Sequence, residues 1–348
     1  MHQFPDAKER GKNVIYFIKR CCAVLLFLAL IFPSGLSSAA EVKPLYTAKT
    51  DMQCLLRAEK KSGADAVSSI PMGATVEILE VDPQWATVRY RGKTGYLSRN
   101  RLINVRTVDP ENTPPYGIQK HAYIATLAVD APVYESMDAG SGILNTIGQG
   151  AKISIVGMVD GWAKIAYWRT FGYIDSRHLT DLIPVSPTDT PISGETPIAA
   201  FTTFYDHTTD TEANLGRMVN LIVSCEYLNL TLPAGKTLDY NEDIGPFSAS
   251  RGYKRGPVFV DGTTKMGFGG GTCQVSATLY NLVMQLPQIN VILRRSHGAN
   301  GSVYVPIGND ASVGTDSLNL IFRNEYDFPI RVEAKAQDGA VFMCIWKQ

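Results

Sequence analysis

Short runs of alternating or β-branched residues, separated by turn residues, fill the first half of the chain after residue 40. Val76-Glu77-Ile78-Leu79 and Ala86-Thr87-Val88-Arg89-Tyr90 have this pattern, with turns expected at Asp82-Pro83 and Arg91-Gly92-Lys93. Because short strands spaced by turns over about 60 residues are typical of small closed sheets, this pattern predicts a small β-barrel.

The pattern occurs twice. Residues 73 and 150, 85 and 162, and 95 and 172 begin matching segments and are each 77 positions apart, without a gap. A constant offset predicts two copies of one domain, placed at residues 45–105 and 119–184. The order of a glycine-led strand, a tryptophan-led strand and Gly-Tyr-aliphatic resembles the bacterial SH3-like (SH3b) domain. The resemblance implies two barrels that bind the cell wall, with Trp85 and Trp162 as either ligand-binding or core aromatics.

The hydrophobic period changes from two towards 3.6 after residue 198. A helix is expected over residues 215–230, with Leu215, Val219, Ile222 and Val223 on its buried face. A second is expected over 272–286, capped by Thr272 and ended by Pro287. Apolar runs predict strands at residues 291–293, 302–305, 318–322, 330–334 and 341–345.

These elements predict that residues 199–348 form an α+β domain with a mainly antiparallel sheet. The fold class of the chain is therefore two small all-β barrels followed by one α+β domain. Residues 185–198 are rich in Pro, Ser and Thr, which predicts a linker.

The N-terminal segment, residues 1–40, is basic, then apolar, then small in side-chain size. The apolar run covers residues 21–32 and is followed by Pro33 and by Ser38-Ala39-Ala40, the order of a secretory signal peptide. Twelve helical residues reach about 18 Å, short of a hydrocarbon core of about 30 Å. The protein is expected to be exported to the cell wall or the extracellular space, with this segment either cleaved or kept as its membrane anchor.

Composition and charge exclude several classes of function. The 348 residues are 45% hydrophobic and carry a formal net charge of zero, so no nucleic-acid partner is expected. Cysteines and histidines do not cluster, so neither a metal site nor another cofactor is expected. Cys225 and Cys344 lie in apolar runs and are expected in the core, whereas His121, His178 and His207 are expected to be solvated.

The run Gly269-Gly270-Gly271 leads directly into Cys273, at the predicted start of the second helix. A helix N-terminus favours negative charge, so a thiol there is expected to lose its proton more easily. Glycines let a ligand approach the backbone closely, but they also let a tight loop dock on a helix with no chemistry at all. Cys273 is therefore either a reactive thiol or a small packing residue.

A thiol enzyme also needs a base and a group that orients the base. His297, at the end of the next strand, is the candidate base, and Asp310 is the first candidate to orient it, with Glu242 second. Gln274, or the first N–H groups of the helix, are candidates for stabilising an oxyanion.

The candidate ligand-binding residues surround these catalytic positions. They are Gly269, Gly270, Gly271, Tyr304, Arg294 and Arg295. The two arginines are suited to holding the terminal carboxylate of a wall peptide, although a solvated arginine is the alternative for either.

A set of motifs in residues 201–347 resembles the VanW family, named after a vancomycin-resistance accessory protein. The motifs include Phe201-Thr202-Thr203, Arg217 with Asn220, Leu232-Pro233-Ala234-Gly235, the glycine–cysteine run through Ser276, Arg294-Arg295-Ser296-His297, Tyr304-Val305-Pro306 and Asp310-Ala311-Ser312-Val313. Ala277 and Gly298 depart from the family pattern, each replacing a hydroxyl residue. The resemblance implies an exported, envelope-associated protein of Gram-positive type.

Three functions follow from these observations. The first is a thiol hydrolase or transpeptidase that acts on peptidoglycan peptides and is held at the wall by the SH3-like repeats. The second is a non-catalytic module that binds peptidoglycan or another cell-wall polymer, and the third is a structural envelope protein. In each, a membrane is a partner only through an uncleaved N-terminal segment.

Overall fold

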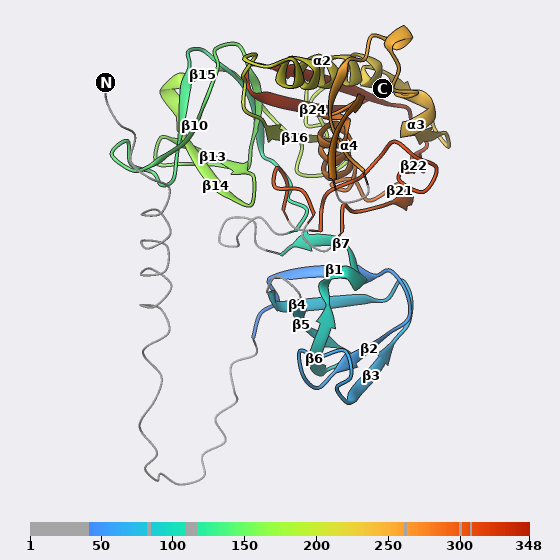
Figure 1. The fold of residues 1–348 in the computed structure, drawn as a ribbon. Coiled ribbons are helices and arrows are strands. Elements are labelled where there is room, and N and C mark those ends of the chain that lie inside the picture. Colours follow the sequence, from blue (N-terminus) through green and yellow to red (C-terminus); the bar gives the residue numbers. More distant parts are fainter. Residues whose placement is uncertain (1–41, 82–84, 109–116, 261–262, 299–300, 307) are drawn as a thin grey trace, which may run out of the picture. The chain divides into compact units, whose positions relative to one another are not determined.

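The computed structural model describes residues 42–348 except 82–84, 109–116, 261–262, 299–300 and 307 (Figure 1). The predicted signal segment, residues 1–40, lies outside the described residues. Within the described part of the chain, no helix has both the length and the apolar character needed to cross a membrane.

Antiparallel strands recur along the first half of the chain at one spacing. The first set is β1 Tyr46–Thr50, β2 Cys54–Arg57, β3 Ala66–Ile70, β4 Thr75–Val81, β5 Trp85–Tyr90, β6 Lys93–Ser98 and β7 Leu102–Thr107. The second is β8 Tyr123–Leu127, β9 Ala131–Tyr134, β10 Ile143–Ile147, β11 Lys152–Ile155, β12 Gly157–Val159, β13 Trp162–Tyr167, β14 Thr170–Asp175 and β15 Leu179–Pro184. Residues 46 and 123, 85 and 162, and 102 and 179 begin matching strands, again 77 positions apart.

The two sets also share backbone and core details. Left-handed residues occur at Arg91 and Trp168 and at Asn104 and Asp181, with φ between 47° and 53°. The buried side chains Leu56, Val76, Val88 and Leu97 of the first set match Val133, Ile153, Ile165 and Ile174 of the second. Each set therefore builds its own apolar core, and Trp85 and Trp162 are half-buried at the edge of it.

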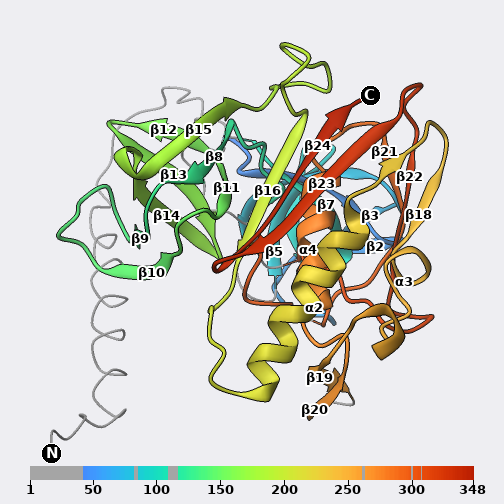
Figure 2. The same ribbon diagram turned by 90° about the horizontal axis from the view of Figure 1, so that it is seen from above.

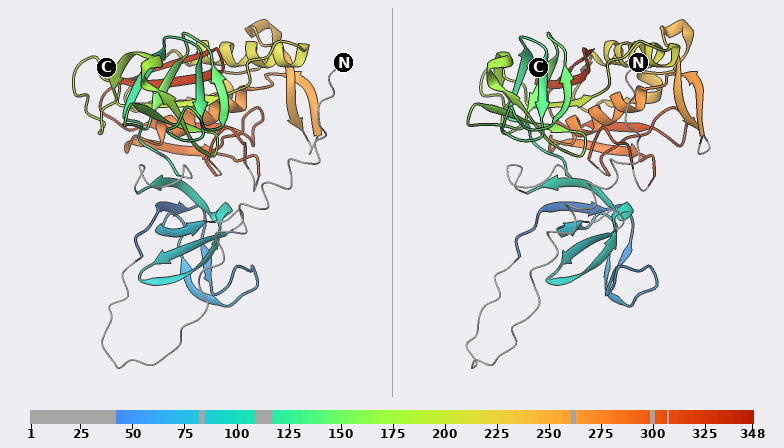
Figure 3. Two further views of the ribbon diagram at one scale, coloured as in Figure 1. Left: turned by 90° about the vertical axis from the view of Figure 1, so that its left-hand side faces the viewer. Right: turned by 60° about the vertical axis from the view of Figure 1, so that its left-hand side comes forward.

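The C-terminal part is α+β with antiparallel sheets, as predicted. Its helices are α2 Glu212–Leu228, α3 Tyr240–Asp243 and α4 Thr272–Val283. Its strands are β16 Ala199–Phe204, β17 Thr231–Leu232, β18 Thr237–Asp239, β19 Arg255–Val260, β20 Thr263–Phe268, β21 Ile289–Arg294, β22 Leu320–Asn324, β23 Ile330–Gln337 and β24 Ala340–Lys347. They form sheets of order β16-β24-β23-β17 and β18-β22-β21 and a β19–β20 hairpin that projects from the domain (Figure 3).

The sheet β16-β24-β23-β17 is covered on both faces, which explains why β16 is buried along its whole length. Helices α2 and α4 pack on one face (Figure 2), where Phe201, Val341 and Met343 join their core. On the other face, Phe204 and Ala340 join the core of the second strand set. Helix α4 lies between the sheet, α2 and the loop after β21, so its side chains are buried all round except at Cys273.

Polar contacts join the second strand set to this sheet, along an internal boundary that we call the seam. Thr202 Oγ1 accepts hydrogen bonds from Ser154 N (2.8 Å) and Ser154 Oγ (3.0 Å), and both residues are buried. At the edge, Lys152 Nζ lies 2.6 Å from Glu333 Oε1. The segment 185–198, expected as a linker, turns back here, since Ser186 N donates to Pro197 O (2.8 Å) and both of its ends are buried.

Three predictions of local structure were wrong. Helix α2 buries Gly216, Asn220, Leu221, Ser224, Cys225 and Leu228, while the predicted core residues Leu215 and Ile222 are 50% and 40% exposed. The reason is that Asn220 Nδ2 donates to Lys254 O (3.0 Å) and Gly270 O (2.9 Å), which turns this polar face inward.

The second helix is also capped differently from the prediction. Gly271, with φ 107°, is the N-cap, so Thr272 is the first helical residue, and the helix ends at Val283 before Pro287 is reached. Residues 302–305 form a turn rather than a strand, because Ser302 and Tyr304 face the cleft described next.

Candidate active site

A cleft of about 440 Å³ opens at the N-terminus of α4. Its lining includes the glycine run Gly269–Gly271, Cys273, His297, Ser302 and Tyr304. The apolar side chains of Phe247, Pro257 and Phe268 also line it. A concave site that combines a thiol, a few polar groups and apolar side chains has the composition of a small-ligand site.

The glycines are needed for packing as well as for access. A Cβ at Gly270 would lie 2.5 Å from the carbonyl carbon of Gly256 in β19. A Cβ at Gly271 would lie 2.9 Å from Cγ of Arg217, and its φ of 107° is left-handed. The run therefore brings α2, β19 and the start of α4 into contact, and it lines the cleft at the same time.

Cys273 stands in the first turn of α4, half-buried. Its Sγ lies 3.7 Å from Val313 O, and its side chain also hydrogen-bonds to the His297 ring. The backbone N–H of Cys273 donates to no backbone carbonyl of the described residues, whereas the N–H groups of Thr272 and Gln274 donate to Gly269 O and Gly271 O. Thiol, ring and a spare N–H donor thus meet at one helix end.

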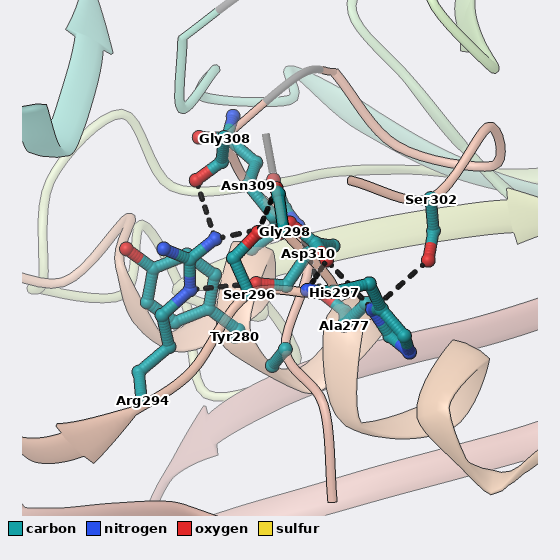
Figure 4. A network of polar contacts seen from close by, with 12 residues as sticks. Ala277, Tyr280, Arg294, Ser296, His297, Gly298, Ser302, Gly308, Asn309 and Asp310 are labelled. Atoms are coloured by element: carbon teal, nitrogen blue, oxygen red, sulfur yellow. Dashed lines mark hydrogen bonds and ion pairs between the residues drawn. The ribbon is translucent and has the colours of Figure 1, made fainter. Parts of the chain in front are cut away.

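Asp310 holds the His297 ring through its Nδ1 atom (Figure 4). Its Oδ2 accepts from His297 Nδ1 and from His297 N, both at 2.7 Å. Since Asp310 occupies Nδ1, the other ring nitrogen, Nε2, is the one available to Cys273. Ser302 Oγ, 3.1 Å from Nδ1, also limits rotation of the ring.

Asp310 is itself held on its other oxygen. Oδ1 accepts from Ser296 Oγ (2.9 Å) and Arg294 Nη2 (3.2 Å), and the carboxylate is fully buried. Loop residues around it are tied to α4, where Ser276 Oγ donates to Ala311 O (2.7 Å) and Asn281 Nδ2 to Asn309 O (2.8 Å). The helix that carries the thiol therefore also positions the carboxylate.

These contacts shift the pKa values of His297 and Asp310. Burial alone would lower the pKa of His297, but hydrogen bonds to Asp310 and Cys273 and the negative charges of both raise that pKa to about 9. Burial would raise the pKa of Asp310, but the bonds from His297 and the charge of Arg294 lower it. At neutral pH the arrangement therefore favours a carboxylate on Asp310 and an imidazolium on His297, whose ring faces the Cys273 side chain.

The other thiols outside residues 1–41 are free but differ from Cys273. Cys225 and Cys344 are buried in the core, as predicted, and burial raises the pKa of both. Neither lines the cleft.

The structure brings most of the predicted site residues together. Cys273, Gln274, His297, Tyr304 and the three glycines line the cleft, and Asp310 lies directly behind His297. The Gln274 side chain faces away from the thiol, since its Nε2 donates to Thr203 Oγ1 and Phe204 O, both at 3.1 Å.

The remaining predicted residues lie away from the cleft. Arg294 directs its guanidinium to Asp310 and to the carbonyl of Gly308. Arg295 and Glu242 are exposed and are not among the residues that line the cleft. The sequence predicted no role for Ser302 or Arg217, but both line the cleft. Arg217 appeared only as one position in the motifs that resemble the VanW family.

The comparisons with known proteins agree with two parts of this description. Residues 216–346 match the family model described as VanW like protein, and residues 56–103 match the bacterial SH3 domain. The chain therefore contains a VanW-like domain and a bacterial SH3 domain. A bacterial SH3 domain implies an association with the cell envelope.

Curated relatives share part of the chain. The uncharacterized protein YoaR of Bacillus subtilis (strain 168) is 33% identical over 135 residues, which cover 38% of this chain and 44% of YoaR. The putative N-acetylmuramoyl-L-alanine amidase YrvJ of the same organism is 20% identical over 140 residues, 39% of this chain and 27% of YrvJ. The chain thus spans less than half the length of these relatives.

Solved structures give only distant likeness. An NlpC/P60 family protein from Bacillus cereus ATCC 10987 is 10% identical, with 42% of this chain and 58% of the other covered and a TM-score of 0.16. NlpC2 from Trichomonas vaginalis is 11% identical, with 88% and 99% covered and a TM-score of 0.18.

Proposed function

We propose that the VanW-like domain is a cysteine-dependent hydrolase or transpeptidase that acts on peptidoglycan peptides. The observation that supports this proposal is the buried Asp310 carboxylate bonded to Nδ1 of His297, whose ring bonds in turn to Cys273 in an open cleft. A nucleophile, a base and a group that orients the base are the parts needed for acyl transfer through a thioester.

The chemistry follows from the order of these groups. The Cys273 thiolate attacks a peptide carbonyl carbon, and the oxyanion that forms is stabilised by the N–H of Cys273 and the positive end of α4. The imidazolium of His297 gives its Nε2 proton to the leaving amine as the C–N bond breaks, which leaves a thioester on Cys273. His297 then takes a proton from a water or an acceptor amine, whose oxygen or nitrogen attacks the thioester carbonyl. The C–S bond breaks, which releases a carboxylic acid or a new peptide and restores the Cys273 thiolate beside the His297 imidazolium.

The choice of wall peptides as substrate rests on the other domain identified in the chain. The bacterial SH3 domain at residues 56–103 supports a role at the cell wall. The similarity to YrvJ, described as a putative amidase, agrees with this role. We extend the proposal to residues 119–184 as a second SH3-like domain, because its strands repeat those of the first with the same 77-residue spacing between residues such as 85 and 162.

Export is part of the same proposal. A substrate in the wall requires the chain to leave the cytoplasm, and residues 1–40 have the order of a secretory signal. The domain limits proposed are 45–105, 119–184 and 199–348, with residues 185–198 joining the last two.

The test is digestion of purified peptidoglycan by the protein without its signal segment. The wild type is expected to release or cross-link wall peptides, as seen by liquid chromatography and mass spectrometry, whereas Cys273→Ala yields none. Cys225→Ala is the matched control, because it removes a buried thiol outside the cleft and should retain activity. Equal product from Cys273→Ala and wild type would rule out the thiol mechanism, and no product from either protein would leave a binding function.

A further inference from the structure

Two arginines of the C-terminal domain are largely enclosed by protein, and their partners differ. Arg294 has a carboxylate, Asp310, whose Oδ1 lies 3.2 Å from Nη2. Arg217, on α2, has no carboxylate within 4.0 Å among the described residues. Its hydrogen-bond partner is neutral, since Nη2 donates to Gln274 Oε1.

The surroundings of Arg217 do not supply the missing charge. Burial lowers the pKa of Arg217, and the acidic groups that oppose this are the phenols of Tyr304 and Tyr205 and the carboxyl of Asp206, which forms no ion pair with it. The Tyr205 ring lies 5.8 Å from the guanidinium carbon. A guanidinium that is partly removed from water and has no counter-ion within 4.0 Å among the described residues favours the binding of an anion.

The position of Arg217 points to the cleft as the source of that anion. Arg217 lines the cleft together with Cys273 and Tyr304. Its aliphatic stem packs against Gly271, where a Cβ would lie 2.9 Å from Cγ of Arg217. Gln274, which accepts its Nη2 hydrogen bond, is the residue next to Cys273 and is itself fixed by Thr203 and Phe204.

We infer that Arg217 binds a carboxylate of the peptide whose carbonyl is attacked by Cys273. This inference rests on the proposed function for the location of the attacked bond, but the binding itself does not require turnover. The planar fork of a guanidinium matches a carboxylate in two parallel hydrogen bonds, which gives direction as well as affinity. The carboxylate is either the C-terminus of the peptide or an acidic side chain near the bond.

The experiment measures equilibrium binding to the Cys273→Ala protein, which does not turn over. The probes are soluble wall stem peptides in three forms: free acid, C-terminal amide, and side-chain amide. The expected result is that one of the two amides binds roughly 10- to 100-fold more weakly than the free acid, and the one that does identifies the carboxylate. Adding Arg217→Gln should remove this preference by weakening the acid alone, and Arg217→Lys should keep part of it.

A matched control is Arg323→Gln, which changes an exposed arginine of β22 outside the cleft and should keep the full preference. Thermal unfolding of each variant shows that the fold is retained, and Arg217→Lys preserves the charge if Arg217→Gln does not fold. The inference is overturned if the free acid does not bind, if acid and amides bind equally, or if the preference survives in Arg217→Gln. A preference that depends on Arg217 in a protein without wall activity would instead keep the inference and reject the enzyme.

Discussion

Two polar networks of the C-terminal domain begin at neighbouring residues of β16 and run to opposite faces of the sheet. Thr203 Oγ1 accepts from Gln274 on the side of the cleft, and Thr202 Oγ1 accepts from Ser154 on the side of the second strand set. Both networks are buried where they meet the strand.

The networks differ in their free donors. In the seam, the N–H and the hydroxyl of Ser154 both donate to Thr202 Oγ1. Towards the cleft, which the thiol lines, the Arg217 guanidinium has only a neutral hydrogen-bond partner, and the Cys273 N–H has no backbone acceptor among the described residues. Buried donors that find an acceptor stabilise a fold, whereas spare donors beside a cleft are suited to a ligand.

The largest effect is expected from His297→Gln, which removes the base and leaves the seam untouched. Turnover of wall peptides should fall roughly a thousandfold or more, because the thiolate loses its partner and the leaving amine loses its proton donor. Alkylation of Cys273 by iodoacetamide at neutral pH should slow in parallel. Unchanged rates of turnover and alkylation would show that the cleft network is structural, like the seam.

Asp310→Asn tests whether the buried carboxylate sets the charge of the histidine. Asp310 helps to raise the pKa of His297 to about 9, so wild-type kcat/KM should decline as pH rises through that value. Removing the carboxylate lowers this pKa, so the alkaline decline should move to lower pH. Arg294 also loses its counter-ion, at a cost of about 3–5 kcal/mol in the free energy of unfolding. If kcat/KM of the variant declined at the same alkaline pH as that of the wild type, Asp310 would not be raising the pKa of His297.

Thr202→Val should affect stability alone. The change leaves the buried N–H of Ser154 without an acceptor, which lowers the free energy of unfolding by about 1–3 kcal/mol in urea titrations. kcat/KM should stay the same. Thr203→Val is the matched control on the other face of β16, and it should also reduce activity because Gln274, and through it Arg217, loses an anchor.

Lys152→Met gives the smallest effect. The ion pair of Lys152 with Glu333 lies at the edge of the seam, with 38% and 27% of the side chains exposed. Such a pair contributes about 1 kcal/mol or less, and added salt should diminish the difference between variant and wild type. A loss as large as that from Thr202→Val would mean that the seam depends on charge rather than on its buried hydroxyls.

The parts of the structure that follow from local pattern were predictable. The alternating strands, the glycines and tryptophans that recur 77 residues apart, as at 85 and 162, and the Gly-Gly-Gly-x-Cys run all carry their signal in neighbouring residues. The order of Cys273, His297 and Asp310 suggested a relay, and the structure places these three side chains in contact.

The parts that depend on tertiary contacts were not predictable. The inward face of α2 carries Asn220 and Gly216 because the backbone of residues 254–256 and 270 packs on it, and no apolar period reports this. His121, expected in solvent, is 1% exposed beside Phe201, because its segment lies between the second strand set and the C-terminal sheet. The contact of Arg217 with Gln274 joins residues far apart in the sequence, so no local pattern around Arg217 predicts it.

An acyl-enzyme on Cys273 can be detected by intact-protein mass spectrometry after rapid acid quenching of a mixture of enzyme and soluble wall peptide. The expected result is a transient mass increase equal to the acyl part of the peptide, located on the fragment that contains Cys273 and absent from Cys273→Ala. Product formed with no adduct at any quench time, or an adduct located on another residue, would contradict it.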